Sequence, residues 1–193
     1  DVEAYIKLIH FHLKNGTNGL VPAGTTGESP TLSHDEHQQV IELCVKESKG
    51  SIPVIAGTGS NSTKEAISLT KHAESVGASG ALVVTPYYNK PTQEGLYQHY
   101  KSINDSCGIP IIIYNIPSRS VIDMNVDTMA RLFELKNIIG VKDATGVLDR
   151  VNEQKKKIGN DFIQLTGNDD NAFEFNKRGG VGAISVTANI APK

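Results

Sequence analysis

The stretch Ile138-Ile139-Gly140-Val141-Lys142 is an apolar run that ends in a cation. A run without polar alternation is typical of a strand buried on both faces, as in a parallel sheet. A lysine at the end of such a strand must find a partner or lose its proton, because an isolated ammonium is costly in an apolar interior. The neutral amine is a nucleophile that forms Schiff bases with carbonyl compounds. Lys142 is therefore either a candidate nucleophile or a structural lysine whose amine reaches water.

Similar apolar runs recur along the chain and alternate with segments of helical period. The expected strands are 19–23, 52–57, 80–86, 109–115, 138–142, 162–167 and 181–186. The expected helices are 2–14, two that open with capping boxes at 33–36 and 62–65, and 95–105, 126–135 and 148–158. This repetition of strand and helix predicts an α/β protein with a parallel sheet.

We expect a (β/α)8 TIM barrel rather than an open doubly wound sheet. In a barrel the residues after the strands share one rim, whereas an open sheet concentrates its chemistry at one switch point. The residues that follow the expected strands and carry this argument are Thr25, Thr58, Tyr87, Tyr114, Lys142, Gly167 and Thr187.

Seven strands after an initial helix predict a single barrel domain over 1–193 that lacks its first strand and is incomplete at both ends. A domain incomplete at both ends would expose strand edges and apolar surface. We therefore expect this segment to fold poorly, or to be inactive, when it is isolated.

Composition argues against several classes of function. The net charge of −2 does not favour a nucleic-acid partner, and the chain has neither a stretch of membrane-spanning length nor a signal-peptide pattern. Cys44 and Cys107 lie far apart and are typical of the reduced thiols of a cytoplasmic protein. We expect no metal site and no membrane association.

Three further segments carry side chains suited to carbonyl chemistry. The 24–28 segment combines turn glycines with the hydroxyls of Thr25 and Thr26, which suit a small carboxylate, although a plain turn is the alternative. Tyr87 and Tyr88 project from a proline-flanked loop, where they can relay protons or pack an interface.

The third segment begins at Tyr114, which ends a strand next to that of Lys142. Its phenol can shuttle protons during Schiff-base formation, or it can be a core tyrosine with a satisfied hydroxyl. Arg119 follows five residues later and suits a bidentate carboxylate clamp. Taken together, the amine, phenol, hydroxyls and guanidinium favour a keto-acid substrate.

These motifs resemble the 4-hydroxy-tetrahydrodipicolinate synthase (dihydrodipicolinate synthase) family of class I pyruvate-dependent aldolases. The matching segments are 24–28, 85–91, 114–119, 140–146 and 167–170, and the likeness spans the whole chain. The resemblance implies a (β/α)8 barrel of which this chain lacks the first strand and the C-terminal helical region. It also implies a carbon-oxygen lyase whose lysine condenses with pyruvate. The enamine then attacks L-aspartate 4-semialdehyde, and the adduct cyclises on the route to diaminopimelate and lysine. No cofactor is implied beyond the Schiff base itself.

The resemblance also implies roles for single residues. Lys142 is the Schiff-base lysine, and Thr25, Tyr114 and Tyr88 form a proton relay in which Tyr88 is offered across a subunit interface. The implied substrate contacts are Thr26 for the pyruvate carboxylate, Arg119 for the semialdehyde carboxylate, and Gly167 and Ile184 for the intermediate through the main chain. N-acetylneuraminate lyases, an alternative within the superfamily, typically lack the Ser-Arg found at 118–119. An inactive fragment is a further alternative.

A regulatory site and an assembly are implied as well. Family members form cytoplasmic homotetramers of tight dimers, and some are inhibited by lysine bound at the dimer interface. The matching positions are Ser29, Pro30, His34, His37, Asn61, Glu65 and Tyr87. Simpler interpretations remain for three of them. Glu65 fits the third position of its capping box, and His34 and His37, one helical turn apart, can be surface residues or a metal pair.

Overall fold

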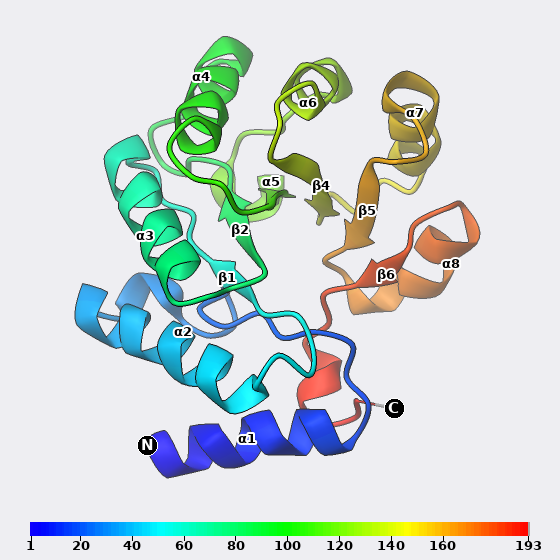
Figure 1. Cartoon of the computed structure of the whole chain (residues 1–193). Coiled ribbons are helices and arrows are strands. Elements are labelled where there is room, and N and C mark those ends of the chain that lie inside the picture. Colours follow the sequence, from blue (N-terminus) through cyan, green and yellow to red (C-terminus); the bar gives the residue numbers. More distant parts are fainter. Residues whose placement is uncertain (193) are drawn as a thin grey trace.

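The computed structural model describes residues 1–192 and contains one parallel sheet of six strands (Figure 1). The strands pair in the order in which they occur along the chain, namely β1 (Ile55–Gly57), β2 (Gly80–Val84), β3 (Ile111–Asn115), β4 (Ile138–Asp143), β5 (Ile163–Thr166) and β6 (Gly182–Ala183). Strand order without reversal excludes the doubly wound alternative. The sheet curls into a half-barrel, which confirms the predicted barrel class.

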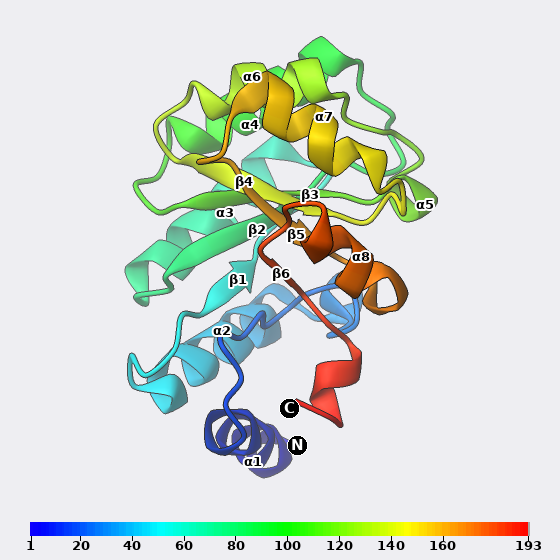
Figure 2. The same cartoon turned by 90° about the vertical axis from the view of Figure 1, so that its right-hand side faces the viewer.

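Helices cover the convex side of the curved sheet (Figures 1 and 2). They are α1 (Val2–Lys14), α2 (His34–Ser48), α3 (Thr63–Ser75), α4 (Gln93–Asn104), α6 (Val126–Phe133), α7 (Asp149–Ile158) and α8 (Ala172–Lys177). The short α5 (Pro117–Ser120) instead follows the carboxyl end of β3. Three short 3-10 turns, η1 (Ser29–Thr31), η2 (Asp169–Asn171) and η3 (Thr187–Asn189), lie in the connections. Within residues 1–192, no helix is both long and apolar enough to cross a membrane.

Strand residues alternate between two apolar layers. Ile111, Ile113 and Val141 belong to the large cluster between the sheet and its helices, whereas Ile112 and Tyr114 belong to a smaller cluster on the inner face. Successive side chains of a strand point to opposite faces, so this alternation follows directly from strand geometry. It places Tyr114, and with it the neighbouring Lys142, inside the half-barrel.

The strand predicted at 19–23 is wrong as a regular strand. Leu20 forms only an isolated parallel bridge with Val54, although the Ile55 amide donates to the Leu20 carbonyl over 2.8 Å. The carbonyls of Pro53 and Pro22 accept from the amides of Leu20 and Gly57 over 3.0 and 2.9 Å, but Pro22 has no amide hydrogen, so the next rung lacks one of its two bonds and no regular ladder forms. The predicted strand at 181–186 is similarly reduced to Gly182–Ala183, which pair with β5.

The two predicted capping boxes have different outcomes. Ser33 and Glu36 form a complete box at the start of α2. At α3 the Ser62 hydroxyl accepts from the Glu65 amide, but the Glu65 carboxylate does not return to the Ser62 amide and bonds elsewhere. The capping interpretation of Glu65 is therefore only half right, and its carboxylate is available for another role.

Candidate active site

Lys142 and Tyr114 lie side by side on the inner face of the half-barrel. They are direct partners in the parallel ladder between β3 and β4. Only 9% of the surface of Lys142 is exposed, and Lys142 Nζ lies 4.1 Å from the centroid of the Tyr114 ring. The amine is thus buried against an aromatic face and does not reach freely into water, which overturns the snorkelling alternative.

Burial lowers the pKa of the Lys142 amine from 10.5 to about 8, because the charged form loses its hydration. The Asp169 carboxylate partly offsets this effect by favouring the ammonium. Asp169 itself accepts hydrogen bonds from the Val186 amide, the Thr187 amide and the Thr187 hydroxyl, at 3.1, 3.0 and 2.9 Å. The Asp169 carboxylate therefore both holds the segment at Val186 and Thr187 and acts on the charge of Lys142.

The Tyr114 phenol lies among polar neighbours contributed by two loops. Burial raises its pKa, while a polar contact with the Thr25 hydroxyl and the charge of Arg119 oppose the rise. Thr25, Tyr114 and Arg119 also line one cavity of about 410 Å³. The structure therefore brings together the predicted hydroxyl, phenol and guanidinium, with Lys142 adjoining the phenol.

Gly167 provides the room that the Lys142 side chain occupies. A Cβ atom at Gly167 would lie 2.9 Å from Lys142 Cε and 2.9 Å from the Ala144 Cβ. The Gly167 amide donates to the Asp143 carbonyl over 2.8 Å, which holds the glycine beside β4. The Ile184 amide donates to the Thr166 carbonyl over 2.9 Å, and its side chain packs on the inner cluster.

The predicted site residues Thr26 and Tyr88 and the predicted rim residue Thr58 do not line the cavity. Thr26 is exposed beside Thr25, and Tyr88 is 87% exposed. Thr58 is buried on the helix side, where its hydroxyl accepts from Thr70 Oγ1 over 2.9 Å. Thr58 is therefore wrong as a rim residue, since alternation along the chain turns it outward.

Residues with strained backbone conformations are concentrated in the loops that surround the cavity. Among residues 1–192, the non-glycine residues of these loops that have positive φ are Ala23, Glu28, Tyr88, Lys90 and Val121. A further one, Lys49, lies elsewhere, at the end of α2. Such conformations are unfavourable for residues with a Cβ and persist where the surrounding structure holds them, commonly at functional sites. Nothing in the residue types at these positions predicts the strain.

The same cavity continues to the residues of the predicted regulatory site. Ser29, His34, His37, Glu65 and Tyr87 line it together with the residues around Tyr114. His34 Nε2 lies 2.7 Å from Glu65 Oε1, and the Ser60 hydroxyl donates to the other carboxylate oxygen. The hydrogen bond from Ser60 holds the pKa of Glu65 below its usual range. The cavity wall therefore carries an anionic carboxylate near neutral pH.

His37 and Asn61 take other partners. Burial lowers the pKa of His37, and its Nε2 lies 2.9 Å from the Gly57 carbonyl, to which it donates. The Asn61 carbonyl accepts from Asn89 Nδ2 over 3.1 Å. No group of three or more metal-ligating side chains occurs among residues 1–192, so the two histidines of α2 lack the further ligands that a metal pair needs.

Comparison with known proteins gives a consistent result. The model of the dihydrodipicolinate synthetase family matches residues 1–193. The chain is 85% identical over 193 residues to the 4-hydroxy-tetrahydrodipicolinate synthase of Pelagibacter ubique strain HTCC1062. The match covers all of this chain and 66% of that relative, so the chain spans about two thirds of its length.

Solved structures agree with the sequence relatives. The chloride-inhibited dihydrodipicolinate synthase of Acinetobacter baumannii, solved with pyruvate, superposes with a TM-score of 0.98 at 51% identity, covering 100% of this chain and 66% of that one. The corresponding protein from Cyanidioschyzon merolae, solved with lysine bound, has a TM-score of 0.95 at 36% identity, covering 98% and 64%.

Proposed function

Because this chain belongs to the dihydrodipicolinate synthetase family, we propose that the full-length protein is a 4-hydroxy-tetrahydrodipicolinate synthase. Its substrates are pyruvate and L-aspartate 4-semialdehyde, and Lys142 supplies the reactive group without a cofactor. The proposal rests above all on the buried Lys142, whose amine lies against Tyr114 and has a pKa of about 8. The pyruvate complex of the Acinetobacter baumannii relative supports the choice of keto acid.

The chemistry begins with the neutral amine of Lys142. It attacks the carbonyl carbon of pyruvate, and loss of water leaves an imine. Loss of a proton from the pyruvate methyl group gives an enamine, whose carbon forms a bond to the aldehyde carbon of the second substrate. The amino group of that substrate then attacks the imine carbon, which closes the ring and releases the Lys142 amine. One water molecule is lost overall.

The surrounding residues move protons and bind carboxylates. Tyr114 and Thr25 relay protons to and from the oxygen that leaves during imine formation, and the polar contact between them supports this role. The pyruvate carboxylate is assigned to Thr26 on the family resemblance; Thr26 itself is exposed, next to Thr25 on the cavity wall. Arg119 on the cavity wall binds the carboxylate of the semialdehyde. Gly167 and Ile184 contact the intermediate through the main chain.

Regulation by lysine is part of the proposal. The carboxylate of Glu65, with His34 beside it, suits the ammonium group of a free amino acid at the far end of the cavity. Ser29, His37, Asn61 and Tyr87 complete the implied site. The lysine-bound Cyanidioschyzon merolae relative supports this choice of inhibitor.

The proposed enzyme is a cytoplasmic homotetramer of dimers, in which Tyr88 enters the site of a neighbouring subunit. The large exposure of Tyr88 supports such a contact, since an aromatic side chain is seldom left in water without a partner. Cys44 and Cys107 are free thiols, as is usual for cytoplasmic proteins.

Trapping with borohydride tests the reaction directly. Reduction of the full-length protein with pyruvate should leave a stable adduct on Lys142, located by mass spectrometry of the digested protein. Turnover with L-aspartate 4-semialdehyde, but not with N-acetylneuraminate, should follow. An unmodified Lys142 would refute the proposal, and an adduct with turnover of the sialic acid alone would assign the chain to another pyruvate aldolase.

A further inference from the structure

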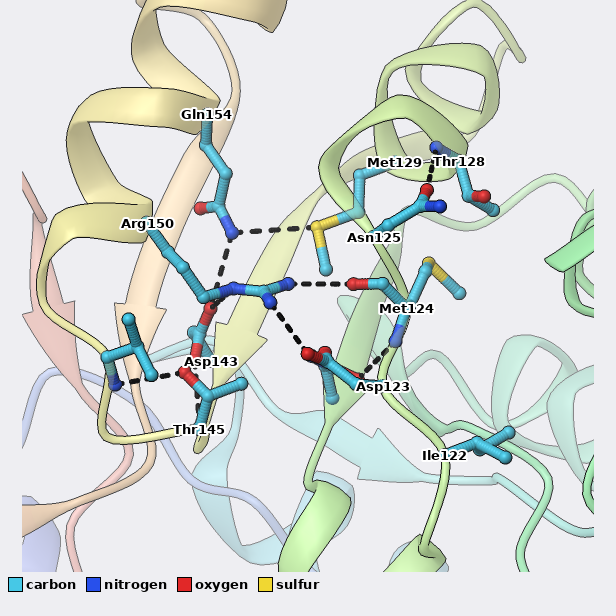
Figure 3. A network of polar contacts seen from close by, with 12 residues as sticks. Ile122, Asp123, Met124, Asn125, Thr128, Met129, Asp143, Thr145, Arg150 and Gln154 are labelled. Carbon is cyan, nitrogen blue, oxygen red and sulfur yellow. Dashed lines mark hydrogen bonds and ion pairs between the residues drawn. The ribbon is translucent and has the colours of Figure 1, made fainter.

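Figure 3 shows a polar network that joins Asp123, Asp143 and Arg150. The network lies behind Lys142 and Tyr114, on the helix side of the same two strands. Asn115 and Asp143 follow these two residues in the chain and are themselves partners in the β3–β4 ladder. Because side chains alternate along a strand, Asn115 and Asp143 point away from the inner face. Lys142 and Tyr114, on the inner face, are thus each followed by a polar residue on the helix side of the sheet.

Asp143 is nearly fully buried, with 3% of its surface exposed, and its carboxylate is fully engaged. Oδ1 accepts from the Thr145 amide at 2.9 Å and from the Thr145 hydroxyl at 2.6 Å. Oδ2 accepts from Gln154 Nε2 at 3.2 Å. Arg150 Nε lies 3.2 Å from the same oxygen, an ion pair without hydrogen-bond geometry. The strand end that carries Lys142 is therefore bound to α7.

Arg150 connects Asp143 to the neighbouring strand. Its Nη1 lies 2.9 Å from Asp123 Oδ2, and Nη2 donates to the Met124 carbonyl over 2.7 Å. Asp123 Oδ1 accepts from Asn115 Nδ2 over 2.7 Å, and Asn115 Oδ1 accepts from the Met124 amide over 3.0 Å. We call Asn115, Asp123, Asp143 and Arg150 the brace.

The brace also closes the base of the loop that carries Arg119. Asn115 precedes this loop and Asp123 and Met124 follow it, so the Asn115 side chain holds its two ends together. The ladder between β3 and β4 ends at Asn115 and Asp143. Beyond this point the fork of Arg150 replaces the ladder as the connection between the two strand ends, and its planar geometry matches several acceptors at once.

We propose that the brace positions Lys142, Tyr114 and the Arg119 loop for the condensation, although none of its members lines the cavity. This inference rests on the function proposed above. A misplacement of about 1 Å by a mutation away from the chemistry can lower a rate by roughly 100-fold. A network that only stabilised the fold would instead change the amount of folded protein and leave the rate of each folded site unaltered.

Arg150→Lys in the full-length protein tests the inference, because lysine keeps the charge but cannot reach all the acceptors of the fork. Borohydride trapping with pyruvate counts the competent sites, and turnover is then expressed per trapped site. We expect kcat per site to fall about 10- to 100-fold and KM for the semialdehyde to rise. Asp123→Asn, which keeps the size of the side chain, should show a smaller change in the same direction.

Arg131→Lys is the matched control. Arg131 Nη1 also lies 2.9 Å from a carboxylate oxygen, that of Glu94, but this pair is exposed on α6 and α4. Its turnover per trapped site should equal that of the wild type. Wild-type turnover per trapped site in both brace variants, with only a lower melting temperature, would overturn the inference while leaving the proposed function intact. Failure of the wild type to trap pyruvate would instead refute the proposed function.

Discussion

Lys142 Nζ lies 4.1 Å from the centroid of the Tyr114 ring, because the two residues are paired across the β3–β4 ladder. Contact with an aromatic face favours the ammonium by about 0.5–2 kcal/mol. Burial acts in the opposite direction and prevails, since the pKa falls from 10.5 to about 8. That change corresponds to about 3 kcal/mol against the charged form. The fold therefore supplies a lysine that is partly neutral near pH 7.

The rate of imine formation should follow the neutral fraction of Lys142. With a pKa of about 8, roughly one amine in ten is neutral at pH 7. The rate constant for imine formation should rise about tenfold per pH unit below 8 and level off above it. Rapid-quench trapping with pyruvate between pH 6 and 9.5 measures this profile. A rate that still climbs steeply above pH 9 would contradict a lowered pKa.

Replacing Lys142 by methionine should stabilise the protein while abolishing adduct formation. The folded pKa is below the unfolded one, so the unfolded state binds more protons between pH 8 and 10.5 and stability rises with pH in this window. Below pH 8 the folded protein bears the full cost of burying the charged amine. Lys142→Met should therefore raise the free energy of unfolding by up to about 3 kcal/mol at pH 7. Urea unfolding at several pH values tests this. The gain should shrink from pH 8 upward, and a pH-independent difference would count against burial as the cause.

Tyr114→Phe should slow imine formation while leaving its pH midpoint in place. The aromatic face against Lys142 is retained, but the hydroxyl that moves protons is lost, and such groups contribute about 10²- to 10⁴-fold. Single-turnover trapping measures the rate. Tyr97→Phe, which removes a phenol on α4 away from the cavity, is the control. Equal rates for the two variants would exclude Tyr114 from the relay.

Gly167→Ala should impair catalysis because its methyl group would meet the Lys142 side chain. The new Cβ would lie 2.9 Å from both Lys142 Cε and the Ala144 Cβ. Overpacking of this kind costs about 1–3 kcal/mol. Adding Ala144→Gly removes one of the two contacts, so it should restore part of the melting temperature but not turnover. Normal kcat in the single variant would show that Lys142 adapts without loss.

Glu65→Gln should weaken inhibition by lysine. The carboxylate has the charge that an ammonium group needs, and hydrogen bonds to charged groups contribute about 1.5–3 kcal/mol, or roughly 10- to 100-fold in affinity. Titration of lysine in the synthase assay, normalised to the uninhibited rate of each variant, measures the change. Glu36→Gln, which alters the other capping glutamate on α2, is the control. An unchanged inhibition curve would place the inhibitor elsewhere.

Local sequence signals predicted most of the fold. Apolar runs such as 138–142 lie between helices whose caps are visible in the sequence, and both features act over a few residues. The failure at 19–23 has a local cause as well, since proline removes the donors that a ladder needs. Thr25, Tyr114 and Arg119 were candidates because they follow expected strands, and they line one cavity. The roles of Thr26, Gly167 and Ile184 came from the family resemblance and stay predictions.

The sequence by itself determined the parallel α/β order and the lysine at the end of an apolar strand, because periodicity and chain order are local properties. Only the tertiary structure decided that Lys142 faces Tyr114, since this depends on the register between two strands. It also decided that Glu65 turns toward His34 rather than its own helix cap, and that Arg150 reaches both Asp143 and Asp123. Such contacts join separate elements, and their geometry exists only when the helices pack on the sheet.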